Sequence, residues 1–214
     1  QDMKLASTTG DFYGYTGSDK ESLRLLREPG FRYADMNMGC GYAQRKGIYS
    51  DDCERYFEEV ALAAEDIGIK MIQAHAPMGK PLAKDNEQFI KDTIRCVDAC
   101  GAWGIPNLVV HSGYVLGMSR EDTLVANREF FRPLLEQAEQ YGVNILVENF
   151  NRMCIDGMYW IDNATDLLAL IELVDHPLFH ACWDTGHANC RGNRQYDDLM
   201  ALRDQLKERK GIKA

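Results

Sequence analysis

The sequence predicts an α/β fold, a parallel (β/α)8 TIM barrel of which about six β/α units are present in this chain. The first observation behind this prediction is a spacing. His75, His111, Glu148 and Asp184 follow one another at intervals of 36, 37 and 36 residues, and each ends a short apolar run typical of a strand. Because one strand, one helix and two loops together take up about this many residues, the spacing predicts repeated β/α units.

The second observation is the way the predicted helices end. Gly68, Gly104 and Gly142 each follow a helical pattern, and the polar residue at the end of the next strand comes 7, 7 and 6 positions later. Glycine is favoured at this place because it adopts the left-handed conformation without a steric penalty. Before Asp184 the helix stop is predicted at Pro177, again 7 positions earlier. The common phase indicates that the units are equivalent.

The individual elements follow from apolar periodicity. Strands are predicted at residues 4–8, 33–36, 70–75, 107–111, 144–149 and 179–184. Helices are predicted at residues 18–27, 51–67, 84–102, 163–174 and 195–209. One more helix is expected to begin after Ser119, which together with Asp122 resembles a capping box, and its apolar face extends to Ala138.

Residues 1–214 are predicted to form one TIM-barrel domain, because no stretch rich in Pro, Gly and Ser divides them. After the last helix, Gly211 precedes what resembles the start of a seventh strand. A closed barrel needs two more β/α units, roughly 60–80 residues, and an open sheet would leave two exposed edges. We therefore expect the domain to be truncated before strands seven and eight.

Composition narrows the classes of partner. A net charge of −9 makes the chain a poor default binder of nucleic acid or of an anionic membrane, and no run of 18 apolar residues occurs. The seven cysteines are dispersed and odd in number, which favours reduced thiols and a cytoplasmic location. Of these, Cys96 and Cys100 share one helix face that we expect in the core. No GxGxxG, P-loop or GxSxG motif supports a nucleotide cofactor or a serine hydrolase.

The polar strand ends predict a divalent-metal site. Parallel strands bring their C-terminal ends to one rim, and two imidazoles with two carboxylates are suitable ligands. Glu148 closes an apolar strand, where a carboxylate is costly to bury unless it is paired or bound to a metal. Asp184 begins the sequence DTGH, in which a tight turn would return His187 toward the same ion or substrate.

Other polar residues near the rim have less specific patterns. Asp35 ends the second strand, 40 residues before His75, and is either a group behind the site or structural. Arg152 follows the fifth strand and would hold a phosphate, orient a carboxylate or lie in solvent. His176 lies before the sixth strand and His180 at its start, at the opposite end of the barrel from the site, and both are expected to be structural.

The segments HAP, HSG, VENF and WDTGHAN, in this order and spacing, resemble the xylose isomerase-like TIM barrel superfamily. That group includes sugar phosphate isomerases and epimerases, inosose dehydratase and AP endonuclease family 2, to which endonuclease IV belongs. The resemblance covers the six units present. In ketose-epimerase-like members the metal ligands would fall on Glu148 and Asp184, with a His and a Glu from strands seven and eight. His187 matches the residue that contacts the sugar near the metal.

Endonuclease IV-like members would use more of the same residues as ligands of a three-zinc cluster. The matching positions here are His75, His111, Glu148, Asp184 and His187. The acidic charge and the few Lys and Arg residues in the rim loops favour a sugar over DNA. Those loops instead contain aromatic side chains that suit a sugar pocket, namely Tyr114, Phe150, Tyr159 and Trp160.

The resemblance therefore implies a metal-dependent sugar or sugar phosphate isomerase or epimerase, which acts by proton transfer through an enediolate on a metal-bound ketose. Glu148 is the candidate base, and His187 would hydrogen-bond a substrate oxygen. His75, His111, His187 and Arg152 would bind substrate or additional metal. The alternatives are an endonuclease IV-like zinc phosphodiesterase on abasic DNA, an inosose dehydratase-like lyase or a non-catalytic barrel.

The expected cofactor is one divalent ion among Mn²⁺, Co²⁺, Mg²⁺ and Zn²⁺, all of which accept mixed carboxylate and imidazole ligands. The expected partner is a small-molecule sugar or sugar phosphate, with neither nucleic acid nor membrane. A homo-oligomer is left open.

Overall fold

The computed structural model describes residues 4–150, 159–190 and 195–209. Within these ranges six parallel strands form one sheet in sequence order, so that each strand pairs with the next one along the chain. The strands are β1 Ala6–Thr8, β2 Tyr33–Asn37, β3 Lys70–His75, β4 Asn107–His111, β5 Asn144–Glu148 and β6 Phe179–Cys182. All six were predicted; β1 begins two residues later than expected, and β6 ends two residues earlier.

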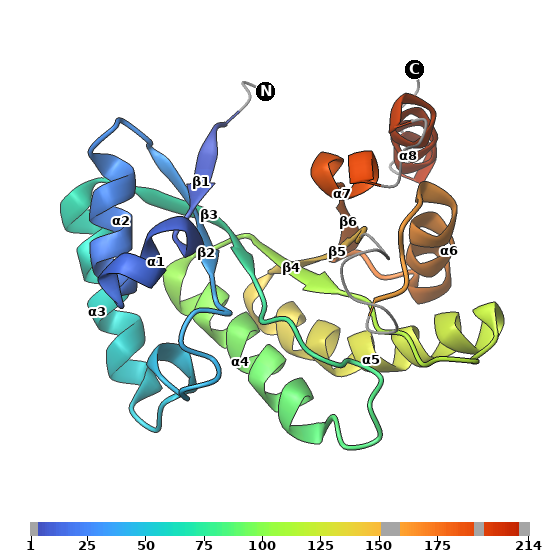
Figure 1. The fold of residues 1–214 in the computed structure, drawn as a ribbon, viewed down its shortest axis with the longest axis horizontal. Coiled ribbons are helices and arrows are strands. Elements are labelled where there is room, and N and C mark those ends of the chain that lie inside the picture. The colour runs from blue at the N-terminus through green and yellow to red at the C-terminus, as the bar shows by residue number, and fades with distance from the viewer. Residues whose placement is uncertain (1–3, 151–158, 191–194, 210–214) are drawn as a thin grey trace.

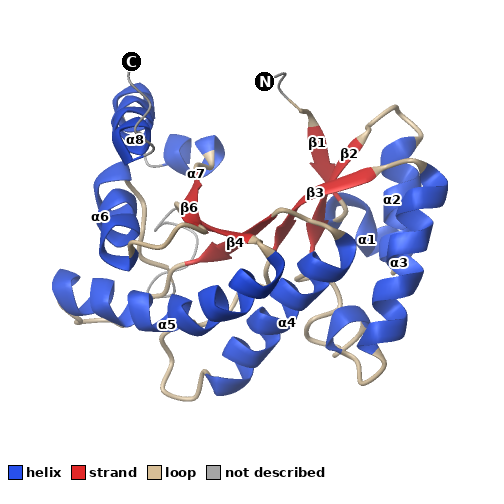
Figure 2. Ribbon diagram, turned by 180° about the vertical axis from the view of Figure 1, so that it is seen from behind, coloured by secondary structure: helices blue, strands red, loops and turns tan. Residues whose placement is uncertain are grey.

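Helices lie on the outer side of this sheet, which forms an open arc with β1 and β6 at its two ends (Figures 1 and 2). The predicted helices are α2 Asp19–Arg27, α3 Cys53–Ile67, α4 Glu87–Trp103, α5 Arg120–Tyr141, α6 Ala164–Val174 and α8 Gln195–Arg209. Alternation of parallel strands with covering helices is the arrangement of a TIM barrel. In the described part of the chain, no helix is long and apolar enough to span a membrane.

Three short elements were not predicted: α1 Gly10–Thr16, the 3₁₀ turn η1 Gly47–Tyr49 and α7 Thr185–Cys190. Each follows a strand by way of the loops at the C-terminal end of the sheet. They are too brief to carry a full apolar stripe, so periodicity does not reveal them. The most consequential is α7, because the predicted tight DTGH turn is in fact the first turn of this helix.

The ends of the long helices agree with the sequence except at α6. Gly68, Gly104 and Gly142 follow their helices with φ values of 69°, 64° and 67°, in the left-handed region. After α6 this position is taken by Asp175, with φ 43°, and not by Pro177 as predicted. Aspartate adopts this conformation more readily than most residues because its short polar side chain can hydrogen-bond locally.

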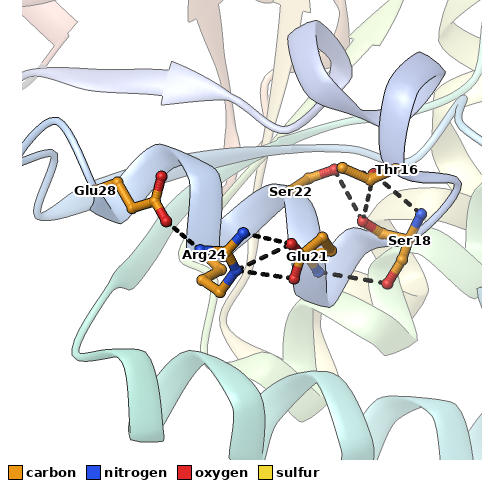
Figure 3. A network of polar contacts seen from close by, with 6 residues as sticks. All are labelled: Thr16, Ser18, Glu21, Ser22, Arg24 and Glu28. Carbon is orange, nitrogen blue, oxygen red and sulfur yellow. Dashed lines mark hydrogen bonds and ion pairs between the residues drawn. The ribbon is translucent and has the colours of Figure 1, made fainter.

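Hydrogen bonds stabilise the start of α2, as Figure 3 shows. The Ser18 side chain accepts from the backbone N–H of Glu21, which is the usual role of a serine at a helix N-terminus. The hydroxyl of Ser22 donates to the Ser18 carbonyl at 2.8 Å. On the exposed face, Arg24 pairs with Glu21 and with Glu28, contacts that add little stability in solvent. The two serine contacts thus fix where α2 begins, after β1 and α1.

The core lies between the sheet and the helices, and the alternation of side chains assigns the opposite face to the barrel interior. In β2, Ala34 and Met36 are buried, whereas Asp35 and Asn37 alternate with them and are only partly buried. Cys96 and Cys100 are buried in α4, as the sequence predicted, and the six cysteines in the described residues are all free thiols. The interior face thus carries the polar groups.

Candidate functional site

A cavity of about 670 Å³ opens at the C-terminal ends of the strands. Side chains from β3, β4, β5 and α7 meet there, because parallel strands deliver their last residues to one rim. Five of the predicted site residues line it, namely His75, His111, Glu148, Asp184 and His187. Arg152 lies outside the described residues.

Two carboxylates and one imidazole form a group that could hold a metal ion. Glu148, Asp184 and His187 each offer one ligand atom, and these atoms lie within 4.8 Å of one another. Glu148 ends β5, and Asp184 lies two residues beyond Cys182, the residue that pairs with Glu148 across the sheet. Oxygen and imidazole donors at this separation fit a divalent ion such as Mn²⁺, Mg²⁺ or Zn²⁺.

The DTGH segment holds His187 close to Asp184. The Asp184 carboxylate accepts from the backbone N–H of His187 at 2.6 Å, so it caps the first turn of α7. At Gly186 an added Cβ would lie 3.1 Å from the Asp184 carboxylate, which leaves little room for a larger residue. The ring of His187 is held as well, since its Nδ1 lies 2.9 Å from the carbonyl oxygen of Asn149.

That contact determines where the lone pair of His187 lies. A carbonyl oxygen can only accept a hydrogen bond, so Nδ1 carries the proton. In the neutral ring the lone pair is therefore on Nε2, the arrangement found in imidazoles that bind metal ions.

Glu148 is almost fully buried, with 4% of its surface exposed, and histidines contact it. His111 Nε2 lies 2.8 Å from Glu148 Oε2, close enough for an ion pair when the ring is protonated. His75 Nε2 lies farther from the same oxygen, at 3.9 Å. The other nitrogen of His111 is buried without a hydrogen-bond partner among the described residues, and the rings of Phe150 and Tyr159 pack against the imidazole.

His75 is oriented by a second carboxylate, that of Asp35. Its Nδ1 lies 2.8 Å from Asp35 Oδ2, and the same oxygen accepts from Gln73 Nε2 at 3.3 Å. Burial acts to lower the pKa of His75. The hydrogen bond and charge of Asp35, with the charges of Glu148 and Asp184, outweigh burial and raise this pKa overall. Asp35, whose role the sequence left open, therefore belongs to the cavity wall.

Asn149 is a residue that sequence reasoning missed. It is fully buried, its side-chain nitrogen donates to the Asp184 carbonyl at 2.9 Å, and its side-chain oxygen accepts from the Asp184 backbone N–H at 2.7 Å. The only available signal was its place directly after Glu148. An asparagine after a strand is common in turns, so that signal has little specificity.

Aromatic rings form part of the wall. The ring centre of Phe150 lies 4.4 Å from that of His187 and 5.2 Å from that of His111. Tyr159 packs against both Phe150 and His111. Of the four expected aromatic residues, only Phe150 lines the cavity: Tyr159 lies behind it, Trp160 packs in the core and Tyr114 packs against the core. Among the described residues, no Lys or Arg lines this cavity.

Comparisons with solved structures agree with this fold. The AP endonuclease family 2 protein from Brucella melitensis is 18% identical, with a TM-score of 0.68 over 86% of this chain and 69% of that chain. The 3-keto-D-glucoside 4-epimerase from E. coli is 18% identical, with a TM-score of 0.74 over 95% of this chain and 76% of that chain. The probable 3-DHS dehydratase from Bacillus anthracis is 19% identical, with a TM-score of 0.72 over 94% of this chain and 70% of that chain.

At such identities the likeness establishes the fold alone. We find no match to this chain among curated protein sequences. The family model described as "Xylose isomerase-like TIM barrel" matches residues 23–213, and this chain therefore belongs to that family.

Proposed function

We propose that the protein is a divalent-metal-dependent sugar isomerase or epimerase. The observation that carries this proposal is the convergence of Glu148, Asp184 and His187 within 4.8 Å at a cavity of about 670 Å³. A cavity of this size suits a small molecule, since such sites measure roughly 300–1,000 Å³. Epimerases and isomerases occur among proteins of the same fold, including one described as 3-keto-D-glucoside 4-epimerase.

Glu148 and Asp184 would hold the ion, which is Mn²⁺, Co²⁺, Mg²⁺ or Zn²⁺. We propose that further ligands come from strands seven and eight, beyond residue 214. When bound, the ion would polarise the substrate carbonyl and acidify the hydrogen on the neighbouring carbon.

Glu148 is the proposed base. Its Oε2 lies 2.8 Å from His111 Nε2 in a buried position, so the imidazole is close enough to steady the carboxylate. The proton would move from the α-carbon to a Glu148 oxygen and leave an enediolate. His187 would present Nε2 to substrate or ion, because its Nδ1 is held by the Asn149 carbonyl. His75 and His111 would complete the walls around the substrate. Phe150 covers one side and limits the entry of water.

We propose a small sugar, neutral or singly phosphorylated, as the substrate, and a reduced, cytoplasmic setting for the free thiols. Nucleic acid binding requires several phosphate contacts from Lys or Arg. In the described part of the cavity wall those residues do not occur, which favours a sugar. The second candidate is cleavage of abasic DNA, which the likeness to an AP endonuclease family 2 protein supports.

Removal of the metal tests the proposal. The protein is depleted with a chelator, assayed for sugar interconversion across a ketose panel, and then supplied with each of the four ions. We expect depletion to abolish turnover and at least one ion to restore it. Undiminished turnover after exhaustive chelation would exclude the proposed mechanism.

A further inference from the structure

We infer that Asn149 is a positioning residue that sets the relative placement of the two proposed metal-binding carboxylates. The inference rests on the proposed metal site. Asn149 directly follows Glu148 in the chain, and its side-chain amide makes two hydrogen bonds to the main chain of Asp184, at 2.7 and 2.9 Å. One residue thus joins the backbone of the first carboxylate to that of the second.

The side-chain amide of Asn149 replaces backbone pairing beyond the end of the sheet. The last backbone pair between β5 and β6 joins Glu148 to Cys182, so the ladder ends before Asp184. In a continued strand, the N–H and C=O groups of Asp184 would pair with a neighbouring backbone. Here the side chain of Asn149 supplies both a donor and an acceptor in place of that backbone. Without it, the Asp184 N–H would lose this acceptor, whereas the Asp184 carbonyl would keep the hydrogen bond from the Ala188 N–H at 3.1 Å.

The backbone carbonyl of Asn149 extends the same arrangement to a third residue. It accepts from His187 Nδ1 at 2.9 Å, while Asp184 itself accepts from the His187 backbone N–H at 2.6 Å. Asp184 and His187 are therefore both hydrogen-bonded to the single residue that directly follows β5. Because Asn149 is fully buried, water does not replace these bonds when they are lost.

Groups that orient metal ligands typically change metal affinity 10–100-fold when removed. We therefore expect Asn149→Ala to raise the dissociation constant for Mn²⁺ by about 10–100-fold. Asn149→Ser keeps a shorter polar group beside Asp184 and should lie between Asn149→Ala and the unaltered protein.

The chain offers a matched control at the other end of the same strand. Asn144 begins β5, and its side chain likewise reaches the neighbouring strand, with bonds to the side-chain oxygen of Asn107 at 3.0 Å and to the Pro106 carbonyl at 3.1 Å. Asn144→Ala thus removes two side-chain hydrogen bonds of a partly buried asparagine far from the rim. A merely structural role for Asn149 would make the two alanine variants alike.

The experiment measures Mn²⁺ binding by titration calorimetry on the metal-depleted full-length protein, together with the thermal midpoint of each variant. We expect Asn149→Ala to weaken Mn²⁺ binding while Asn144→Ala does not, with both variants folded at the temperature of the titration. Equal Mn²⁺ affinities in the two alanine variants, whether both are unchanged or both are weakened, would overturn the inference. If Asn149→Ala does not fold, the same comparison is made with Asn149→Ser. Failure of the unaltered protein to bind Mn²⁺, Co²⁺, Mg²⁺ or Zn²⁺ would instead overturn the proposed function, and the inference with it.

Discussion

His75 and His187 face the same cavity but are held by different kinds of acceptor. The Nδ1 of His75 lies 2.8 Å from a carboxylate oxygen of Asp35, whereas the Nδ1 of His187 lies 2.9 Å from the backbone carbonyl of Asn149. Both acceptors fix the proton on Nδ1. A carboxylate also stabilises a positive charge on the ring, and a carbonyl, which has no net charge, does so far less.

The two histidines of one cavity therefore have different electrostatic environments and suit different roles. The β2–β3 side, with Asp35 and His75, is suited to a polar or charged contact with substrate. The β5–β6 side, with Glu148, Asp184 and His187, is suited to hold an ion and move a proton. We therefore expect substitutions on the two sides to affect different measured quantities.

The largest expected effect is on the β5–β6 side. Glu148→Gln keeps the size of the side chain but removes its charge and its ability to accept a proton. Loss of a general base typically costs about 10²–10⁴-fold in rate, and the loss of a ligand charge adds to it. We expect turnover to fall by at least this much, measured by steady-state kinetics. The control is Glu172→Gln, an exposed residue on α6; a Glu148→Gln enzyme as active as this control would contradict the account.

The next comparison is between the two histidines themselves. His187→Asn should raise the dissociation constant for metal or lower turnover by about 10–100-fold, because the Nε2 lone pair is lost. His75→Asn should leave metal affinity unchanged and mainly raise KM. Metal content is measured by atomic emission and KM by steady-state kinetics. If His75→Asn were as damaging as Glu148→Gln and released bound zinc, a multi-zinc nuclease site would be favoured.

A buried carboxylate outside the cavity can be compared with Asp35, because its hydrogen-bond donor is a hydroxyl and not an imidazole. Asp19, at the start of α2, accepts from the Tyr56 hydroxyl, and its other oxygen is buried without a partner. Burial raises the pKa of Asp19 to about 6 from 3.8, although the Tyr56 hydrogen bond acts to lower it.

The sign of the effect follows by linkage. Since the folded protein holds this proton more tightly, the contribution of Asp19 to stability is full below pH 3.8 and is lost as the pH rises through about 6. The loss amounts to about 3 kcal/mol by order of magnitude. Asp19→Asn should remove it from the pH dependence of the free energy of unfolding, measured with denaturant. An unchanged pH profile in this variant would refute the assignment.

The smallest expected effect concerns Asp35 in the metal-depleted protein. The raised pKa of His75 means that its pairing with Asp35 stabilises the fold fully below pH 6.5 and less as the pH rises through the folded-state value. Asp35→Asn removes the negative charge, so the thermal midpoint should vary less with pH above 6.5 than in the unaltered protein. Identical slopes in the two proteins would show that Asp35 does not favour the charged ring.

How far the sequence leads is seen at particular residues. The strands, and the glycines after α3, α4 and α5, were predictable because their signals are local and repeat. The pairing of Asp35 with His75 was not, since the register shifts between Ala34 and Asp35, and such irregularities have no sequence signature here. The contacts of Asn149 depend on where β6 stops, which periodicity does not specify to within two residues.

The central claim is that Glu148 removes a proton from the α-carbon of a sugar bound in the cavity. It is tested most directly by running two assays in parallel on one metal-loaded sample of the full-length protein. The first follows the exchange of sugar α-hydrogens into heavy water across a panel of ketoses, and the second follows cleavage of abasic-site DNA. We predict exchange with at least one ketose and no cleavage of DNA. Efficient cleavage of abasic DNA, with no exchange for any ketose in the panel, would contradict the account.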